Sequence, residues 1–136
     1  MQIKALKSEQ RRIIEEMINR LENMEFYVEA NISSSRCPYP ILGHIPDIMA
    51  YRGSHRIIVE VETSDSLQDE DILLQRLSIF SKMRMGQSEF HIVLPDESLV
   101  KFQGKLDHLN IIVDKFFTYS EILSEEESEG QDSRGK

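Results

Sequence analysis

The stretch that decides the fold is GHIPDIMAYRGSHRIIVEVETSDS, residues 43–66, in which two strand-like runs flank a Gly-Ser pair. Residues 45–51 and 56–62 are rich in apolar and β-branched side chains, as strands are. Gly53-Ser54 is typical of a type II′ hairpin loop, with glycine supplying the positive φ of the first central position. Such a loop pairs Arg52 with His55. Counting back along both strands then places Asp47 directly opposite Glu60.

Three carboxylates are predicted to gather on one face of this hairpin. Side chains of directly opposed residues share a face, with Cβ atoms about 4.5–5.5 Å apart. Glu62 lies two residues beyond Glu60 and therefore points to the same side as Glu60 and Asp47. The other face carries apolar residues that we expect in the core: Ile57, Val59 and Val61.

Opposed like charges destabilise a strand pair, so this cluster needs compensation. Carboxylate oxygens are the ligands that Mg²⁺ and Mn²⁺ prefer, and a divalent metal site is one interpretation. A solvated sheet face with alternating glutamates is the other. The spacing alone leaves both open.

Outward from the hairpin, hydrophobic periodicity and turn residues predict the remaining elements. They are a helix at 8–24, a strand at 26–32, a loop at 36–44, a helix at 69–85, a strand at 89–94, a helix at 96–107, a strand at 110–118 and a helical turn at 119–123. This α-β-β-β-α-β-α-β order predicts an α/β domain over residues 1–123, with a mixed sheet flanked by helices. Residues 124–136 have no large apolar side chain and are expected to form a disordered acidic tail.

Composition narrows the class of protein. The 136 residues carry a net charge of −8, which disfavours a protein that coats nucleic acid by bulk electrostatics. The single cysteine, Cys37, excludes an internal disulfide and a cysteine-based zinc site. Neither a secretory signal nor an apolar run long enough to span a membrane is present in the sequence, so we expect a cytoplasmic protein.

The hairpin also resembles a known family. Pro46-Asp47 followed by Glu60-Val61-Glu62, in an αβββαβ order of elements, is similar to the PD-(D/E)xK nuclease superfamily, which includes archaeal Holliday junction resolvases. The resemblance covers residues 8–117 and implies a restriction-endonuclease-like core with Asp47 and Glu60 as ligands of Mg²⁺ or Mn²⁺. Glu62 occupies the place of the motif's lysine. The first helix of such nucleases sometimes adds an acidic ligand, for which Glu9, Glu15 and Glu16 are candidates.

Glu62 can act as a general base or extend the metal site, or a lysine from elsewhere can replace the motif's lysine. Lys82 is that candidate, because Gln75, Ser78 and Lys82 form a polar stripe on helix 69–85. The resemblance implies that Gln75 and Lys82 contact the DNA backbone. His44, three residues before Asp47, is a further candidate for contact with a phosphate or the metal. A solvated helix residue and a loop histidine are the plain alternatives for Lys82 and His44.

Two functions follow from these expectations. The first is a metal-dependent nuclease that hydrolyses DNA phosphodiester bonds, with Asp47, Glu60, Glu62 and Lys82 as its catalytic residues. The second is a non-catalytic domain of the same fold that binds DNA or a protein partner. A domain of this size covers few base pairs, so a homodimer or a partner subunit is expected for a specific nuclease.

Overall fold

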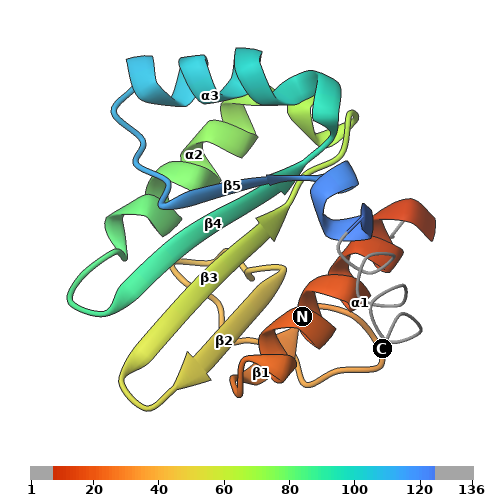
Figure 1. Ribbon diagram of the computed structural model, residues 1–136. Helices are drawn as coiled ribbons and strands as arrows, with labels where there is room; N and C mark the ends of the chain where they lie inside the picture. The colour runs from red at the N-terminus through yellow and green to blue at the C-terminus, as the bar shows by residue number, and fades with distance from the viewer. Residues whose placement is uncertain (1–7, 125–136) are drawn as a thin grey trace.

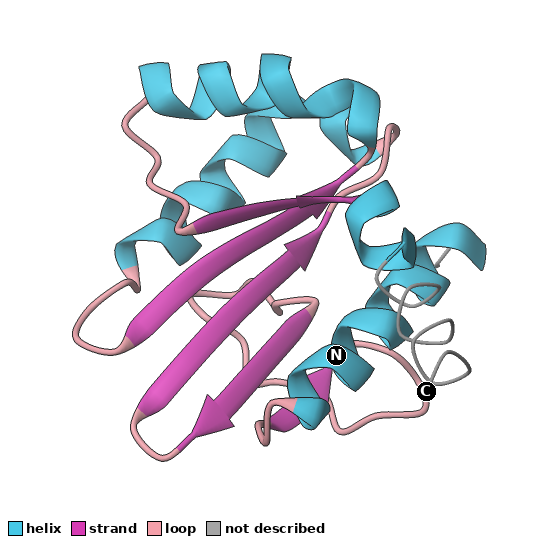
Figure 2. Ribbon diagram, viewed as in Figure 1, coloured by secondary structure: helices cyan, strands magenta, loops and turns pink. Residues whose placement is uncertain are grey.

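A five-stranded mixed sheet forms the middle layer of the protein, and helices cover both of its faces (Figures 1 and 2). The computed structural model describes residues 8–124. The elements are α1 (Ser8–Asn23), β1 (Tyr27–Ala30), β2 (Ile48–Arg52), β3 (His55–Val61), α2 (Glu70–Lys82), β4 (Ser88–Leu94), α3 (Leu99–His108) and β5 (Lys115–Thr118). Short 3₁₀ turns, η1 (Ser66–Gln68) and η2 (Asp96–Ser98), precede α2 and α3. The predicted α/β class is confirmed.

The strands lie in sequence order across the sheet, β1-β2-β3-β4-β5. β1, β2 and β3 form an antiparallel meander, whereas β3, β4 and β5 run parallel to one another. Helices α2 and α3 make the crossovers that parallel neighbours require. In the hairpin, Arg52 pairs with His55 and Gly53 has φ 60°, so the predicted loop and register are both confirmed.

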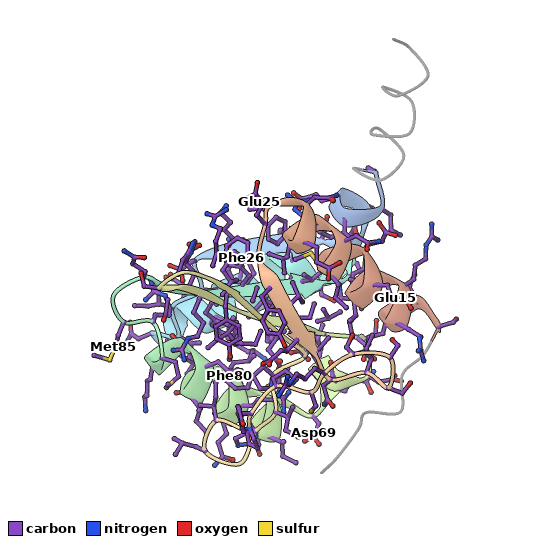
Figure 3. The ribbon with its side chains drawn as sticks, turned by 90° about the horizontal axis from the view of Figure 1, so that it is seen from below. Glu15, Glu25, Phe26, Asp69, Phe80 and Met85 are labelled. Carbon is purple, nitrogen blue, oxygen red and sulfur yellow. The ribbon has the colours of Figure 1, made fainter. Side chains whose placement is uncertain are left out.

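The sheet buries apolar side chains on both faces. On one side, α1 and the helical segment 119–124 cover Ile57, Val59 and Val61, as expected for the inward face of the hairpin. On the other side, α2 and α3 cover a second core that includes Met49, Ile58, Phe80, Phe90 and Ile92. Figure 3 labels Phe26 and Phe80, which belong to the first and the second core respectively.

Strand β5 begins at Lys115, later than the expected strand 110–118, because Asn110 and Ile111 form the C-terminal cap of α3. The Ile111 amide donates to the Leu106 carbonyl at 2.9 Å and the Asn110 amide donates to the Asp107 carbonyl at 3.1 Å. With Asn110 at φ 58°, this is a Schellman motif, in which a left-handed residue ends the helix. Ile111 and Leu106 also share the second core, so the apolar run after α3 completes a helix cap.

The same motif ends α1 and shortens the expected strand 26–32. The Phe26 amide donates to the Leu21 carbonyl at 3.0 Å, and Glu25 takes the left-handed position at φ 68°. Glycine or asparagine usually occupies this position. Phe26 therefore closes the helix by packing on Leu21 in the first core, and β1 begins only at Tyr27.

Other bounds differ by a few residues. The expected helix 69–85 ends at Lys82, and the expected helix 96–107 begins as the 3₁₀ turn η2. The helical turn expected at 119–123 runs to residue 124, and the rest of the expected acidic tail lies outside the described residues. Among the helices of residues 8–124, none has the length and apolar character needed to cross a bilayer.

Candidate metal centre

Asp47 and Glu60 are locked together by the backbone of the hairpin. The Asp47 amide donates to Glu60 Oε2 at 2.8 Å, and the Val61 amide donates to Asp47 Oδ2 at 2.8 Å. Each carboxylate therefore accepts a hydrogen bond from the strand opposite its own. This reciprocal pair fixes both side chains at the end of the β2–β3 ladder and places Asp47 opposite Glu60, as the hairpin register predicts.

Glu62 joins them from the residue after β3. Its Oε1 accepts a hydrogen bond from Ser66 Oγ at 2.9 Å. Ser66 is held in turn by Thr63, because the Thr63 amide donates to Ser66 Oγ at 2.8 Å and the Ser66 amide donates to Thr63 Oγ1 at 3.1 Å. This Thr63–Ser66 turn ends the strand and orients the Glu62 carboxylate.

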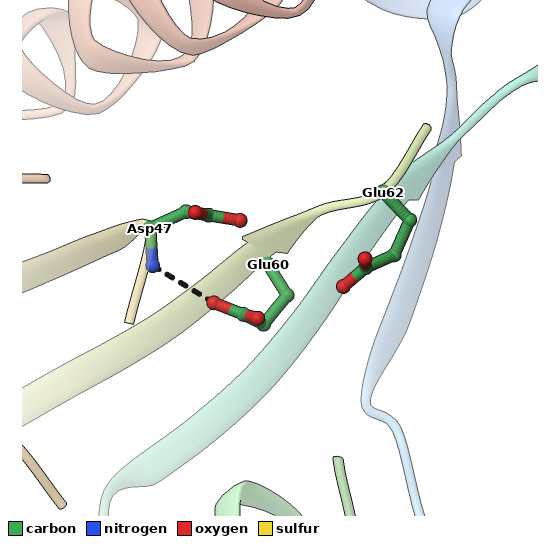
Figure 4. A group of neighbouring side chains, drawn as sticks. All are labelled: Asp47, Glu60 and Glu62. Carbon is green, nitrogen blue, oxygen red and sulfur yellow. Dashed lines mark hydrogen bonds between the residues drawn. The ribbon is translucent and has the colours of Figure 1, made fainter. Parts of the chain in front are cut away.

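The three carboxylates converge and are buried. One oxygen from each of Asp47, Glu60 and Glu62 lies within 4.8 Å of the other two, and the side chains point toward one another in Figure 4. The residues are 1%, 0% and 2% exposed. This overturns the interpretation of a solvated face with alternating glutamates, because α2 covers this side of the sheet.

The spacing suits a divalent cation. Two oxygens bound to one Mg²⁺ lie up to about 4.2 Å apart, and Ca²⁺ allows about 5 Å. A separation of at most 4.8 Å is thus within a small side-chain adjustment of coordination.

Arg76, on α2, is a member of the site that the sequence patterns did not indicate. Its Nε donates to Glu60 Oε1 at 2.6 Å and its Nη2 to Glu60 Oε2 at 3.3 Å. The same Nη2 donates to the Ile45 carbonyl, so Arg76 ties α2 to β3 and to the loop that leads into Asp47. Arg76 occupies the apolar phase of its helix, beside Leu73, Leu77 and Phe80. An arginine among the apolar, inward-facing positions of a helix is the sequence signal that could have revealed Arg76 as a site residue.

The electrostatics of the site are strongly coupled. Burial acts to lower the pKa of Arg76, but the carboxylates, Glu60 above all and then Asp47 and Glu62, raise it above its usual value. Arg76 is therefore cationic, and it brings one positive charge to a group that carries three negative charges when fully ionised.

Gln75 and Lys82, which the polar stripe of helix 69–85 suggested as site residues, lie away from the three carboxylates. Gln75 is exposed, and Lys82 is exposed in the last turn of α2, about 9 Å along the helix axis from Arg76. That end of α2 faces the start of β3, since Arg56 Nη2 donates to the Met83 carbonyl at 3.3 Å. His44 is half-buried and pairs its backbone with Ile41, outside the carboxylate group.

The first helix adds no ligand to this group within the described residues. Glu9, Glu15 and Glu16 are not part of the cluster, which consists of Asp47, Glu60 and Glu62. α1 instead sends Gln10 to the end of β3, where its Nε2 donates to the Val61 carbonyl at 3.2 Å.

A cavity of about 490 Å³ opens beside this strand end, on the α1 side of the sheet. Its lining includes the acidic residues Glu9, Asp96 and Glu97 together with Thr63 and Tyr119. The Tyr119 hydroxyl donates to the Glu62 carbonyl at 2.5 Å and so seals the strand end from this side. The acidic lining does not suit a phosphate.

A second ionisable cluster lies near the hairpin loop. Glu89 Oε2 contacts His55 Nε2 at 2.5 Å, and Glu89 Oε1 contacts His91 Nε2 at 2.9 Å. The hydrogen bond from His91 lowers the pKa of Glu89, and burial lowers the pKa of His91 although Glu89 opposes that shift. Arg52, the last residue of β2, donates to the Met24 carbonyl at 2.7 Å, so this basic side chain makes an internal contact.

Comparison with known proteins supplies no relative. No protein-family model, no curated protein and no solved structure matches this chain.

Proposed function

We propose that the protein is a metal-dependent nuclease that hydrolyses DNA phosphodiester bonds, with Asp47, Glu60 and Glu62 as ligands of Mg²⁺ or Mn²⁺. The observation that carries the proposal is the buried convergence of these three carboxylates on one hairpin. Hard divalent cations with oxygen ligands are the usual agents of phosphodiester hydrolysis.

The fold supports the same reading. A helix, an antiparallel meander, a crossover helix and a parallel strand follow one another, with the carboxylates where the second strand of the meander begins and the third ends. This is the order of a restriction-endonuclease-like core, to which we assign the domain.

In the proposed reaction, each side chain has a role that its contacts support. A bound divalent metal would lower the pKa of a water molecule and stabilise negative charge on the phosphate and the leaving oxygen. Asp47 and Glu60 hold that ion, and Arg76 fixes both oxygens of Glu60. Glu62, oriented by Ser66, serves as a third ligand or as the base that takes the proton from water.

Lys82 fits the role of the motif's lysine less well than Glu62 does. It is exposed and lies in the last turn of α2, at the far end from the carboxylates. We therefore expect Lys82 to influence DNA binding more than the chemical step.

A non-catalytic DNA- or protein-binding domain is the second candidate. One observation favours it: Glu60 is already bonded to Arg76 and to the Asp47 amide, so a hydrogen-bonded ion pair accounts for part of the cluster without a metal. Buried ion pairs of this kind also occur as purely structural features.

A cleavage assay separates the two candidates. With Mn²⁺ or Mg²⁺, the wild type should cut DNA, and Asp47→Asn and Glu60→Gln should each lower the rate by several orders of magnitude. Glu62→Gln should be nearly inactive and Lys82→Ala only mildly impaired. Absence of cleavage of linear, branched and single-stranded DNA with both metals would favour the non-catalytic domain, and inactive Lys82→Ala with active Glu62→Gln would reverse the assignment of the base.

A further inference from the structure

The loop that leads into Asp47 exposes two large side chains at its tip. Tyr39 is 81% exposed and Leu42 is 80% exposed, whereas Ile41 between them packs on the α2-side core. Residues 39–42, here called the 39–42 tip, therefore have a half-buried anchor, Ile41, and two exposed side chains that contribute nothing to the core.

The backbone of the tip is held in an unfavourable conformation. Ile41 and His44 pair through hydrogen bonds of 2.8 and 3.0 Å, and the two residues between them, Leu42 and Gly43, have φ 50° and φ 85°. Positive φ at both central positions is the pattern of a type I′ turn, for which Asn-Gly is the favoured pair. Leucine is disfavoured in the left-handed region. The fold gains nothing from an exposed leucine here, and strained positions of this kind cluster at functional sites.

The loop is attached directly to the carboxylate site. The Ile45 carbonyl accepts a hydrogen bond from Arg76, and Asp47 follows two residues later. Ile41 packs on the same core as α2, so the loop and the Glu60 carboxylate lie on the same side of the sheet.

The charge of the loop suits a polyanion better than the acidic cavity beside the strand end does. Residues 30–46 contain no aspartate or glutamate, but they include Arg36 and His44, in a chain whose net charge is −8. The cavity on the other side of the strand end has an acidic lining. Within residues 30–46 no acidic side chain would repel a nucleic acid strand, whereas the lining of the cavity would.

We propose that the 39–42 tip binds unpaired bases of single-stranded DNA, with Tyr39 stacking on a base and Leu42 packing against the neighbouring one. This rests on the proposed function, because it names the substrate class of the same site. Apolar and aromatic side chains interact with base faces only where the bases are free of a duplex stack. An acidic protein cannot rely on phosphate neutralisation, and stacking supplies affinity that does not depend on the charge of the protein.

The test measures binding without chemistry. A short single-stranded oligodeoxynucleotide with a 2-aminopurine base is titrated with the full chain in EDTA, and its fluorescence reports stacking. Tyr39→Ala should weaken binding about tenfold, because a base–aromatic contact typically contributes that much. Leu42→Asn should also weaken binding, because asparagine removes the apolar contact with the neighbouring base. Binding by the wild type should depend weakly on salt, with a log–log slope no steeper than about −0.7, since residues 30–46 contain one arginine and no lysine, and that arginine, Arg36, also contacts Glu29 Oε2 at 3.9 Å.

Two controls separate lost contacts from lost folding. Leu42→Asn relieves the left-handed strain, so its Tm should rise by a few degrees while its DNA affinity falls. Glu25→Asn relieves the same strain at φ 68° near the other end of β1, and should raise Tm without changing the affinity. A rise in stability together with a loss of binding is an outcome that a purely structural loop would not give.

The outcomes distinguish this inference from the proposed nuclease activity. Equal affinity of the wild type, Tyr39→Ala and Leu42→Asn, or no binding at all, overturns the inference, whether or not the wild type cleaves DNA with Mn²⁺. Loop-dependent binding without any cleavage upholds the inference and refutes the nuclease. A concentration-dependent dimer that Tyr39→Ala disrupts, with unchanged DNA affinity, would assign the tip to self-association and also overturn the inference.

Discussion

Replacing Arg76 with methionine removes the guanidinium from the carboxylate cluster and keeps a flexible apolar chain on α2. Glu60 is fully buried, whereas the side chain of Arg76 is 18% exposed. Removing one partner of a buried ion pair typically costs about 3–5 kcal/mol, because the other charge stays buried. The partial exposure of Arg76 favours the low end, about 3 kcal/mol at neutral pH. For a domain of this size, that loss lowers Tm by about 10 °C.

Urea unfolding followed by circular dichroism measures this change, with the slope of the transition as a check that the unfolded state is unaltered. Lys82→Met on the same helix is the matched control and should change the free energy of unfolding by less than about 0.5 kcal/mol. Glu60→Gln added to Arg76→Met should restore part of the stability, because it removes the unpaired charge. Millimolar Mn²⁺ should stabilise Arg76→Met by mass action.

A loss of stability in Arg76→Met no greater than that in Lys82→Met would show that the ion pair of Arg76 with Glu60 does not stabilise the fold. Additive effects of Arg76→Met and Glu60→Gln on the free energy of unfolding would lead to the same conclusion, because residues in one ion pair must be coupled.

Further predictions concern the second ionisable cluster and the helix ends. The folded state lowers the pKa of His91, so stability should fall as pH drops from about 7 toward 5, and His91→Gln should flatten this part of the urea-midpoint profile. Glu89, whose pKa is lowered above all by the hydrogen bond from His91 and further by His55, should add a loss of stability at more acidic pH that is smaller in His91→Gln. At the left-handed ends of α1 and α3, Glu25→Asn should stabilise the protein by about 0.5 kcal/mol and Asn110→Ala should destabilise it by about 1 kcal/mol in the same assay. If Glu25→Asn and Asn110→Ala changed the free energy of unfolding equally and in the same direction, the role of the left-handed residues as helix caps would be contradicted.

The element order and the carboxylate cluster were predictable because they depend on short-range signals. Gly53-Ser54 fixes the hairpin loop, and the loop fixes which residues oppose one another, so the convergence of Asp47 with Glu60 follows from counting. Helical and strand periodicities gave the order of the remaining elements, but their ends depended on capping. Phe26 and Ile111 extend apolar runs in the sequence, yet each closes a helix.

The surroundings of the site were not predictable in the same way, because they depend on how α2 packs. The polar stripe containing Gln75 and Lys82 turned out to face solvent, and Arg76 lies on the opposite, sheet-facing side. The burial of Glu60 and Glu62 likewise depends on α2 covering this side of the sheet. The left-handed φ of Leu42 is a consequence of the Ile41–His44 pairing, which has no clear mark in the sequence.

The most direct test of the central claim is anomalous diffraction from crystals of the protein grown or soaked with millimolar Mn²⁺. The account predicts a manganese peak among the carboxylates, bonded to oxygens of Asp47, Glu60 and Glu62, and loss of that peak in Glu60→Gln. An occupied manganese site elsewhere on the surface, with no anomalous density in the carboxylate cluster, would contradict it.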